Sequence, residues 1–170
     1  QIGYAHVFYN SAIGLVATPS WSKSNELEGS WFGAVVTGVG DVNNDTYDDV
    51  LIGAPYTKVS IDGQDQPVGC AYLYLGSSTG LKASPAWTQC GTTIGGKFAA
   101  SLAAVGDINQ DGYDDFLVGE PFFSLSNEKQ GAVYLFFGSV GGVRTDYYER
   151  TLGNKSDTEF GTSVSSAGNI

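Results

Sequence analysis

Two nine-residue segments of this chain carry oxygen-bearing side chains at alternate positions. Residues 41–49 read DVNNDTYDD and residues 107–115 read DINQDGYDD, with six of the nine positions identical. Asp, Asn and Asp occupy positions 1, 3 and 5 of both segments, and another Asp closes each segment at position 9. A hard cation such as Ca²⁺ takes about six to eight oxygen ligands, which a tight loop can deliver from alternate residues. The pattern therefore predicts two calcium sites.

Each segment is expected to supply four side chains and the backbone carbonyl of the Tyr at position 7, whose ring would pack. The two predicted ligand sets are Asp41, Asn43, Asp45, Tyr47 and Asp49, and Asp107, Asn109, Asp111, Tyr113 and Asp115. Three carboxylates in one loop repel each other unless a cation lies between them. Mg²⁺ would demand a stricter octahedral arrangement, so Ca²⁺ is the favoured ion. The alternative is a pair of solvated acidic turns.

The two segments differ at the sixth position, where a sharp turn is expected. Gly112 suits a positive φ, whereas the β-branched Thr46 does not. Because Asn44 could shift the turn, the first site is expected to be weaker or differently shaped. Asp48 and Asp114 stand beside the closing ligands and are expected to hydrogen-bond neighbouring backbone rather than a metal.

Composition narrows the fold and the partners. The chain has 170 residues and a formal net charge of −10, which argues against binding to nucleic acid or to an anionic membrane. Its 24 glycines and 13% aromatic residues favour short strands joined by tight turns. No apolar run approaches the roughly 20 residues of a membrane-spanning helix, so no direct membrane insertion is expected. The first residues are expected to form a strand rather than a signal peptide.

Internal repetition sets the expected organisation of residues 1–170 as a single domain. Apolar runs that begin at Gly3, Gly69 and Gly131 are 66 and 62 residues apart, and a Phe-centred series at residues 32, 98 and 160 has the same spacing. A third motif occurs as DDVLIGAPY and DDFLVGEPF. The expected units are residues 1–30 (partial), 31–96, 97–158 and 159–170 (partial).

Each full unit contains four candidate strands: a Phe-Gly segment, a segment ending in Gly-x-Pro, a Tyr-rich segment and a shorter last one. Four antiparallel strands in a repeat of this length are typical of a β-propeller blade. The predicted fold class is all-β, with about two and a half blades of a larger propeller. The Phe-Gly strand is expected to be the innermost of each blade.

The order of the motifs resembles the FG-GAP repeat over practically the whole chain. The Phe-Gly element appears as WFG, KFA and EFG, and the second element as GAP and GEP, so Ala99 and Glu120 depart mildly from the pattern. FG-GAP repeats build the propeller of integrin α subunits and of many secreted or surface proteins of microbes. The resemblance implies an extracellular or cell-surface module whose partners include the remaining blades or neighbouring subunits. Its acidic loops resemble the calcium loops of that family at the positions named above.

Two further features bear on the cellular compartment. Cys70 and Cys90 lie on segments that pair within a propeller blade, so the resemblance favours a disulfide, with two buried reduced thiols as the alternative. Asn154 begins an Asn-Lys-Ser sequon and is a candidate for glycosylation.

Three functions are left open for such a module. The leading prediction is calcium-stabilised adhesion, protein binding or surface architecture, without catalytic residues or an organic cofactor. The alternatives are a non-catalytic propeller of a secreted hydrolase and a lectin whose tryptophans Trp21, Trp31 and Trp87 stack on glycans. The segment GSSTG at residues 76–80 matches a nucleophile elbow, but its middle Ser is replaced by Val140 and Ala12 in the other units. It is therefore interpreted as a turn.

Overall fold

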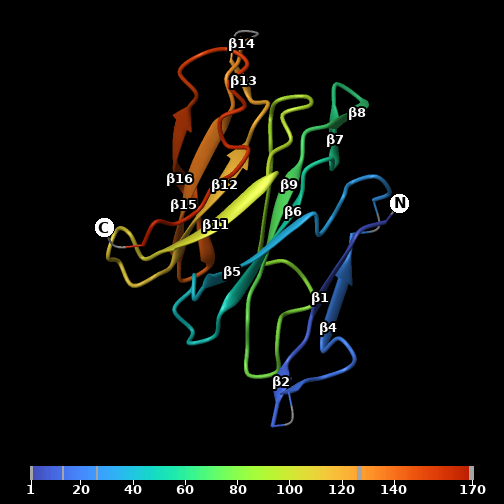
Figure 1. Ribbon diagram of the computed structural model, residues 1–170, viewed down its shortest axis with the longest axis vertical. Helices are drawn as coiled ribbons and strands as arrows, with labels where there is room; N and C mark the ends of the chain where they lie inside the picture. Colours follow the sequence, from blue (N-terminus) through green and yellow to red (C-terminus); the bar gives the residue numbers. More distant parts are fainter. Residues whose placement is uncertain (1, 13, 26, 126–127, 169–170) are drawn as a thin grey trace.

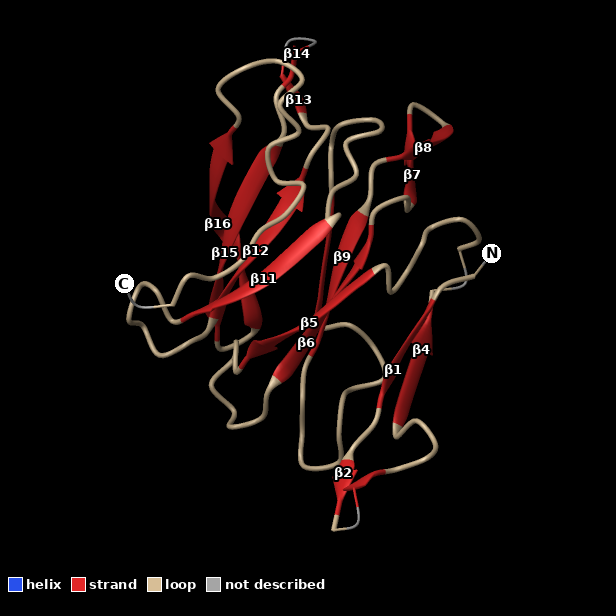
Figure 2. Ribbon diagram, in the orientation of Figure 1, coloured by secondary structure: helices blue, strands red, loops and turns tan. Residues whose placement is uncertain are grey.

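The computed structural model describes residues 2–12, 14–25, 27–125 and 128–168. Over those residues the chain is built of strands and loops without a helix, as Figure 2 shows. None of the described segments could cross a membrane as a long apolar helix. The all-β prediction is confirmed.

Two four-stranded antiparallel sheets form the body of the molecule (Figure 1). Blade B has the order β10-β9-β6-β5 and blade C the order β11-β12-β15-β16. The strands of blade B are β5 (Val35–Gly40), β6 (Asp49–Ala54), β9 (Cys70–Tyr74) and β10 (Trp87–Cys90). The strands of blade C are β11 (Ser101–Gly106), β12 (Asp115–Glu120), β15 (Ala132–Ser139) and β16 (Gly142–Leu152).

A third, two-stranded sheet consists of β1 (Tyr4–Val7) and β4 (Trp21–Ser24), here named blade A. By their place in the repeat these strands correspond to β9 and β10. Short hairpins that the repeat pattern did not reveal lie between the strands. They are β2 (Asn10–Ser11) with β3 (Gly14–Leu15), β7 (Lys58–Ile61) with β8 (Gln64–Pro67), and β13 (Ser124–Leu125) with β14 (Glu128–Lys129).

The first strand of each full blade lies at the edge of its sheet, and β5 and β11 lie against each other. This is the place expected of the innermost strands of neighbouring propeller blades. The Phe-Gly residues themselves, however, form a turn rather than the start of the strand. Trp31 and Gly33 have φ angles of 57° and 82°, and β5 begins only at Val35. The strand of the Phe-Gly segment therefore begins after the motif itself, because positive φ angles are incompatible with an extended strand.

Each Phe-Gly turn packs on the preceding blade, which explains why the two repeat motifs occur together. A Cβ added to Gly53 would collide with the carbonyl oxygen of Ala99, and one added to Gly119 would collide with that of Gly161. Glycine in the Gly-x-Pro element therefore leaves room for the turn that follows in the next repeat.

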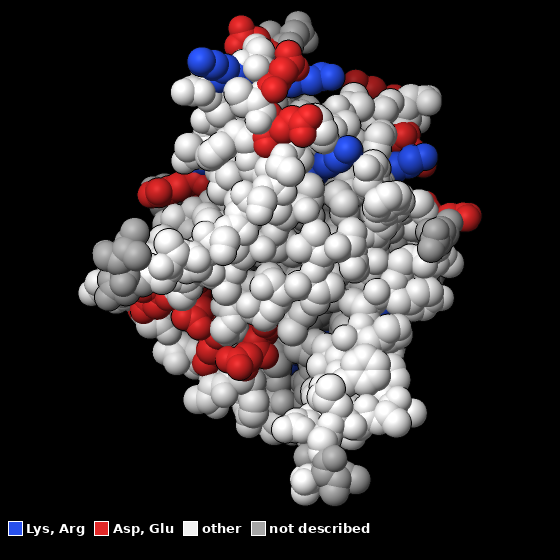
Figure 3. Space-filling model, viewed as in Figure 1, with Lys and Arg blue, Asp and Glu red and all other residues white. Residues whose placement is uncertain are grey.

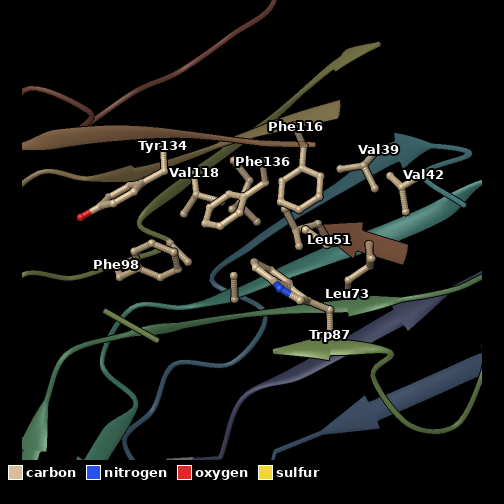
Figure 4. Close-up of a cluster of buried hydrophobic side chains, with 14 of the residues drawn as sticks. Val39, Val42, Leu51, Leu73, Trp87, Phe98, Phe116, Val118, Tyr134 and Phe136 are labelled. Atoms are coloured by element: carbon tan, nitrogen blue, oxygen red, sulfur yellow. The ribbon is translucent and has the colours of Figure 1, made fainter. Parts of the chain in front are cut away.

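Aromatic side chains fill the space between blades B and C (Figure 4). Trp87 of blade B makes edge contacts with Phe116 and Phe136 of blade C, with ring centroids 5.6 and 5.0 Å apart. Phe98 meets Tyr134 in the same way at 5.3 Å. Edge-to-face pairs of this kind add to the stabilisation from buried apolar area.

Candidate metal-binding loops

The two acidic segments occupy matching loops at the same end of blades B and C. Loop B (residues 41–49) joins β5 to β6, and loop C (residues 107–115) joins β11 to β12. The strand register shifts between Gly38 and Gly40 and between Ala104 and Gly106, so a bulge precedes each loop. Figure 3 shows Asp and Glu side chains gathered at the end of the blades that carries these loops, where β5 and β11 end.

Within loop B, carboxylates accept hydrogen bonds from the backbone of the loop itself. Asp41 accepts from the N–H groups of Asp45 at 2.9 Å and Thr46 at 2.6 Å. Asp45 accepts from the N–H of Tyr47 at 3.0 Å and from the side-chain amide of Asn43 at 2.9 Å. Four of the five predicted ligand residues are thus gathered in one network.

Loop C repeats these four hydrogen bonds and adds a fifth, because the N–H of Asp111 also donates to Asn109 Oδ1 at 3.0 Å. Asp107 accepts from the N–H groups of Asp111 at 3.0 Å and Gly112 at 2.8 Å. Asp111 accepts from Tyr113 N–H at 3.1 Å and from the Asn109 amide at 3.0 Å. The four shared bonds follow from the equal spacing of acceptors in the two loops.

The closing aspartates lie at the inner side of the loops and are fully buried. The two carboxylate oxygens of Asp49 accept from the N–H groups of Gly76 at 2.8 Å and Val42 at 3.0 Å. Asp115 binds the amides of Gly138 and Ile108 in the same way. Burial raises the pKa of Asp49 to about 6 and also raises the pKa of Asp115, although the amide bonds act in the opposite direction.

The two tyrosines at position 7 differ in exposure. Tyr47 is 40% exposed, contrary to the expected packing of its ring, whereas Tyr113 is half-buried.

Both loops adopt the same left-handed turn at their sixth residue. The φ angle is 76° at Thr46 and 91° at Gly112, and the fourth residues Asn44 and Gln110 also have positive φ angles of 56° and 59°. The turn of loop B is therefore not shifted by Asn44, contrary to that prediction. Thr46 instead adopts a conformation that is unfavourable for a β-branched residue.

The donor set of the loops fits a hard cation. Among the described residues, no group of three or more His, Cys, Asp or Glu side chains is arranged to hold a metal ion. The predicted sites, however, also use Asn and backbone oxygens. In loop B the Oδ1 atom of Asn43, one of the predicted ligands, is buried and has no hydrogen-bond partner within the protein. Oxygen-only donors of this kind are those that Ca²⁺ prefers.

The residues at position 8 behave differently in the two loops. Asp114 accepts a hydrogen bond from the backbone N–H of Asp41 at 2.9 Å, as predicted for a residue that binds backbone. This bond joins loop C to loop B and was not foreseen, because the sequence does not show which blades are neighbours at this point. The side chain of Asp48 is exposed and makes no hydrogen bond within the described part of the chain.

Glu120 is a buried residue whose role the sequence reasoning missed. Its Oε2 atom accepts a hydrogen bond from the Tyr134 hydroxyl at 2.6 Å, while its Oε1 atom is buried without a partner. Burial raises the pKa of Glu120 to about 7, against the opposing effects of Tyr134 and of the charge of Arg150. The replacement of Ala by Glu in the Gly-x-Pro element was the signal that could have revealed it.

A disulfide joins Cys70 and Cys90, which confirms the pairing favoured above over two reduced thiols. The two residues face each other across β9 and β10, with their Cα atoms 4.0 Å apart. Asn154 is exposed in the segment that follows β16.

The remaining candidates of the sequence analysis are explained by packing and turns. Trp21 contacts Tyr74 at 5.0 Å and Trp87 is buried between blades, so only Trp31 of the three tryptophans is largely exposed, at 58%. Gly80 N–H donates to the Ser77 carbonyl at 2.9 Å, which closes a turn in the GSSTG segment.

Comparison with known proteins identifies the repeats. The FG-GAP repeat model matches residues 32–67 and 98–136. The chain is 35% identical over 147 residues to integrin alpha-8 of Gallus gallus, 39% over 124 residues to integrin alpha-5 of Xenopus laevis and 32% over 148 residues to integrin alpha-PS5 of Drosophila melanogaster. These alignments cover 86, 72 and 87% of the chain but only 13, 11 and 14% of the relatives. The chain belongs to the FG-GAP repeat β-propellers and is homologous to part of the integrin α subunits.

Proposed function

We propose that the chain is a calcium-stabilised part of an extracellular propeller that binds other proteins in adhesion. The observation that carries the calcium proposal is the repeated oxygen network of loops B and C, with the unsatisfied Asn43 Oδ1 atom in loop B. Asp41, Asn43, Asp45, Tyr47 and Asp49 would hold one ion, and the matching residues of loop C the other.

The proposed role of the ion is structural. When bound, Ca²⁺ would neutralise the three carboxylates of each loop, which have no basic partner in the network described above. Apart from Tyr47 and Ile108, the exposed residues of the loops are polar or glycine, so packing contributes little to fixing them. Cation binding would therefore replace packing as the interaction that orders each loop and fastens β5 to β6 and β11 to β12.

Two observations support an extracellular place and a binding role. Disulfides such as Cys70–Cys90 persist in oxidising compartments. The chain is homologous to part of the integrin α subunits, which supports an adhesion-type module without catalytic activity. The partners we propose are protein ligands on the loop faces, with further blades or a neighbouring subunit completing the assembly. A non-catalytic propeller of a secreted hydrolase would share the same calcium loops.

Calcium titration by calorimetry tests this proposal. The unaltered chain should bind two ions, and a chain with both Asp107→Ala and Asp111→Ala should retain only one site, in loop B. A matched Asp65→Ala variant, altered in the exposed β7–β8 hairpin, should bind as the unaltered chain does. Absence of calcium binding by the unaltered chain would contradict the proposal.

Removal of the cation should also lower stability. A ligand that is present at a hundredfold its Kd stabilises the folded state by about 2.7 kcal/mol, which corresponds to about 5 to 10 °C in Tm for a chain of this size. A melting curve in chelator should show this loss. Strontium should restore most of it and magnesium less, because Sr²⁺ tolerates a similar oxygen shell. An unchanged Tm would show that the loops are held by their hydrogen bonds alone.

A lectin function is tested separately. Trp31 is the one tryptophan exposed enough to stack on a sugar ring. Glycan-array binding that is lost in Trp31→Ala would favour this function over protein binding.

A further inference from the structure

Hydrogen bonds cross between blades at the first ligand of loop B. Asp41 donates its N–H to the Oδ2 atom of Asp114 at 2.9 Å, and Asp114 donates its N–H to the carbonyl of Asp41 at 3.1 Å. One residue further, Ser139 N–H donates to the carbonyl of Val42 at 2.9 Å. Residues of blade C thus hold the backbone on both sides of the Asp41 side chain.

The backbone of loop B leaves room for this contact. Gly40 has a φ angle of 79°, and a Cβ at this position would overlap the carboxylate of Asp114. Asp114 is half-buried between the two loops. Its carboxylate therefore has a defined place against residues 40 and 41, and a side chain at position 40 would remove it.

Asp114 also belongs to loop C, between Tyr113 and Asp115, two of the ligands proposed there. A cation in loop C would fix the backbone of these neighbours and hence the position of Asp114. The same residue then positions Asp41, the first proposed ligand of loop B. Sites joined through one shared structural element are expected to influence each other's affinity, and the influence is reciprocal.

We propose that Asp114 is a positioning residue that couples the two cation loops, so that calcium bound in loop C raises the calcium affinity of loop B and calcium in loop B raises that of loop C. This inference rests on the proposed function of the loops. It adds that the two sites fill cooperatively and that the coupling passes through the hydrogen bonds between Asp114 and Asp41.

Asp48 provides a matched control because it is the same position of the repeat in blade B. Its side chain is exposed and, in the described part of the chain, has no hydrogen bond. Asp48→Ala removes the same charge at a similar distance along its loop without removing a contact between the loops. It should leave the coupling intact.

Two substitutions at Asp114 separate hydrogen bonding from charge. Asp114→Asn keeps an oxygen that can accept the Asp41 N–H, whereas Asp114→Ala keeps neither the acceptor nor the charge. Coupling through the hydrogen bond should survive in Asp114→Asn and be lost in Asp114→Ala. Coupling through charge would be lost in both.

The experiment measures the calcium affinity of loop B with loop C intact or disabled, by calorimetry on the whole chain. Asp111→Ala disables loop C and should weaken calcium binding at loop B about fivefold, at the lower end of common coupling factors. In Asp114→Ala the same Asp111→Ala change should have no further effect on loop B, whereas in Asp48→Ala the fivefold loss should remain. As the reciprocal test, Asp45→Ala should weaken loop C by the same factor. Circular dichroism melts verify that each variant is folded.

The outcomes separate the two proposals. If the unaltered chain binds two ions and Asp111→Ala leaves the calcium affinity of loop B unchanged, the coupling is overturned. The proposed function then stays in place. Equal behaviour of Asp114→Ala and Asp48→Ala would also overturn it. A chain that takes up no calcium would overturn the proposed function and the coupling with it.

Discussion

Blades B and C have the same strand order and the same loop network, yet different side chains stabilise them. The blades differ at three matched places: Cys70–Cys90 against Ala132–Leu152, Ala54 against Glu120, and Thr46 against Gly112. A covalent bond in one blade corresponds to an apolar pair in the other, and a buried methyl group to a buried carboxyl group. The repeat therefore specifies the backbone, while single positions can carry different side-chain interactions.

The disulfide is expected to make the largest difference between the blades. Replacing Cys70 with Ala and Cys90 with Leu gives blade B the pair found in blade C. A disulfide that closes a loop of 20 residues contributes about 3 kcal/mol, mainly by restricting the unfolded chain. Urea unfolding should show a loss of this size.

Reductant provides the control for the disulfide. It should destabilise the unaltered chain by a similar amount and leave the double variant unchanged. If the double variant is as stable as the unaltered chain, packing alone holds β9 to β10 and the two blades do not differ in this respect.

Glu120 is expected to make blade C sensitive to pH. Because burial raises its pKa from 4.5 to about 7, the folded chain keeps a proton that the unfolded chain has already released. The stability that this proton contributes is present below about pH 4.5 and is lost as the pH rises to about 7. Glu120→Gln, which stays uncharged, should therefore be more stable than the unaltered chain by roughly 3 kcal/mol at pH 8 and about equal to it at pH 4.5.

Thermal melts across this pH range check the expectation for Glu120. The exposed Glu128 on the hairpin β13–β14 offers a control, since Glu128→Gln should not reproduce the effect. A stability difference between Glu120→Gln and the unaltered chain that does not change with pH would contradict the assignment of the titration to this group.

The residue at the sixth loop position is expected to make the smallest difference. A non-glycine residue in a left-handed conformation costs about 1 kcal/mol or somewhat more. Thr46→Gly should relieve this cost and raise the calcium affinity of loop B about fivefold. Gly112→Thr should lower the affinity of loop C by a similar factor, as measured by calorimetry. Opposite or absent changes would show that the turn of loop B carries no strain relevant to binding.

Much of the candidate site could be read from the residues. The equal spacing of Asp41, Asn43 and Asp45 and of their counterparts in loop C predicted two matching loops, and four hydrogen bonds are common to both, although Asp111 N–H donates to Asn109 Oδ1 in loop C alone. Positive φ at position 6 was expected from Gly112 and occurs at Thr46 as well. A local pattern suffices here because the acceptors bind amides only a few residues away.

The bond between Asp114 and Asp41 could not be predicted in this way. It spans 73 residues and depends on how blade C lies beside blade B. The burial of the Glu120 Oε1 atom without a hydrogen-bond partner could not be predicted either, because only packing decides whether a carboxyl group is exposed to solvent or buried. The hairpins β7–β8 and β13–β14 were also missed, since short polar strands give almost no alternation of apolar residues.

The sequence by itself determined the four-stranded repeat and the two oxygen-rich loops, because each depends on spacing that the chain repeats, and the resemblance to the FG-GAP repeat indicated the cysteine pair. Tertiary structure alone decided that the Phe-Gly residues form a turn seated on the glycine of the previous blade, that Glu120 is enclosed and that loop C holds the backbone of loop B. The physical reason is the range of the interactions. Periodic side chains and local acceptors act within a few residues, whereas close packing and burial depend on which blades become neighbours.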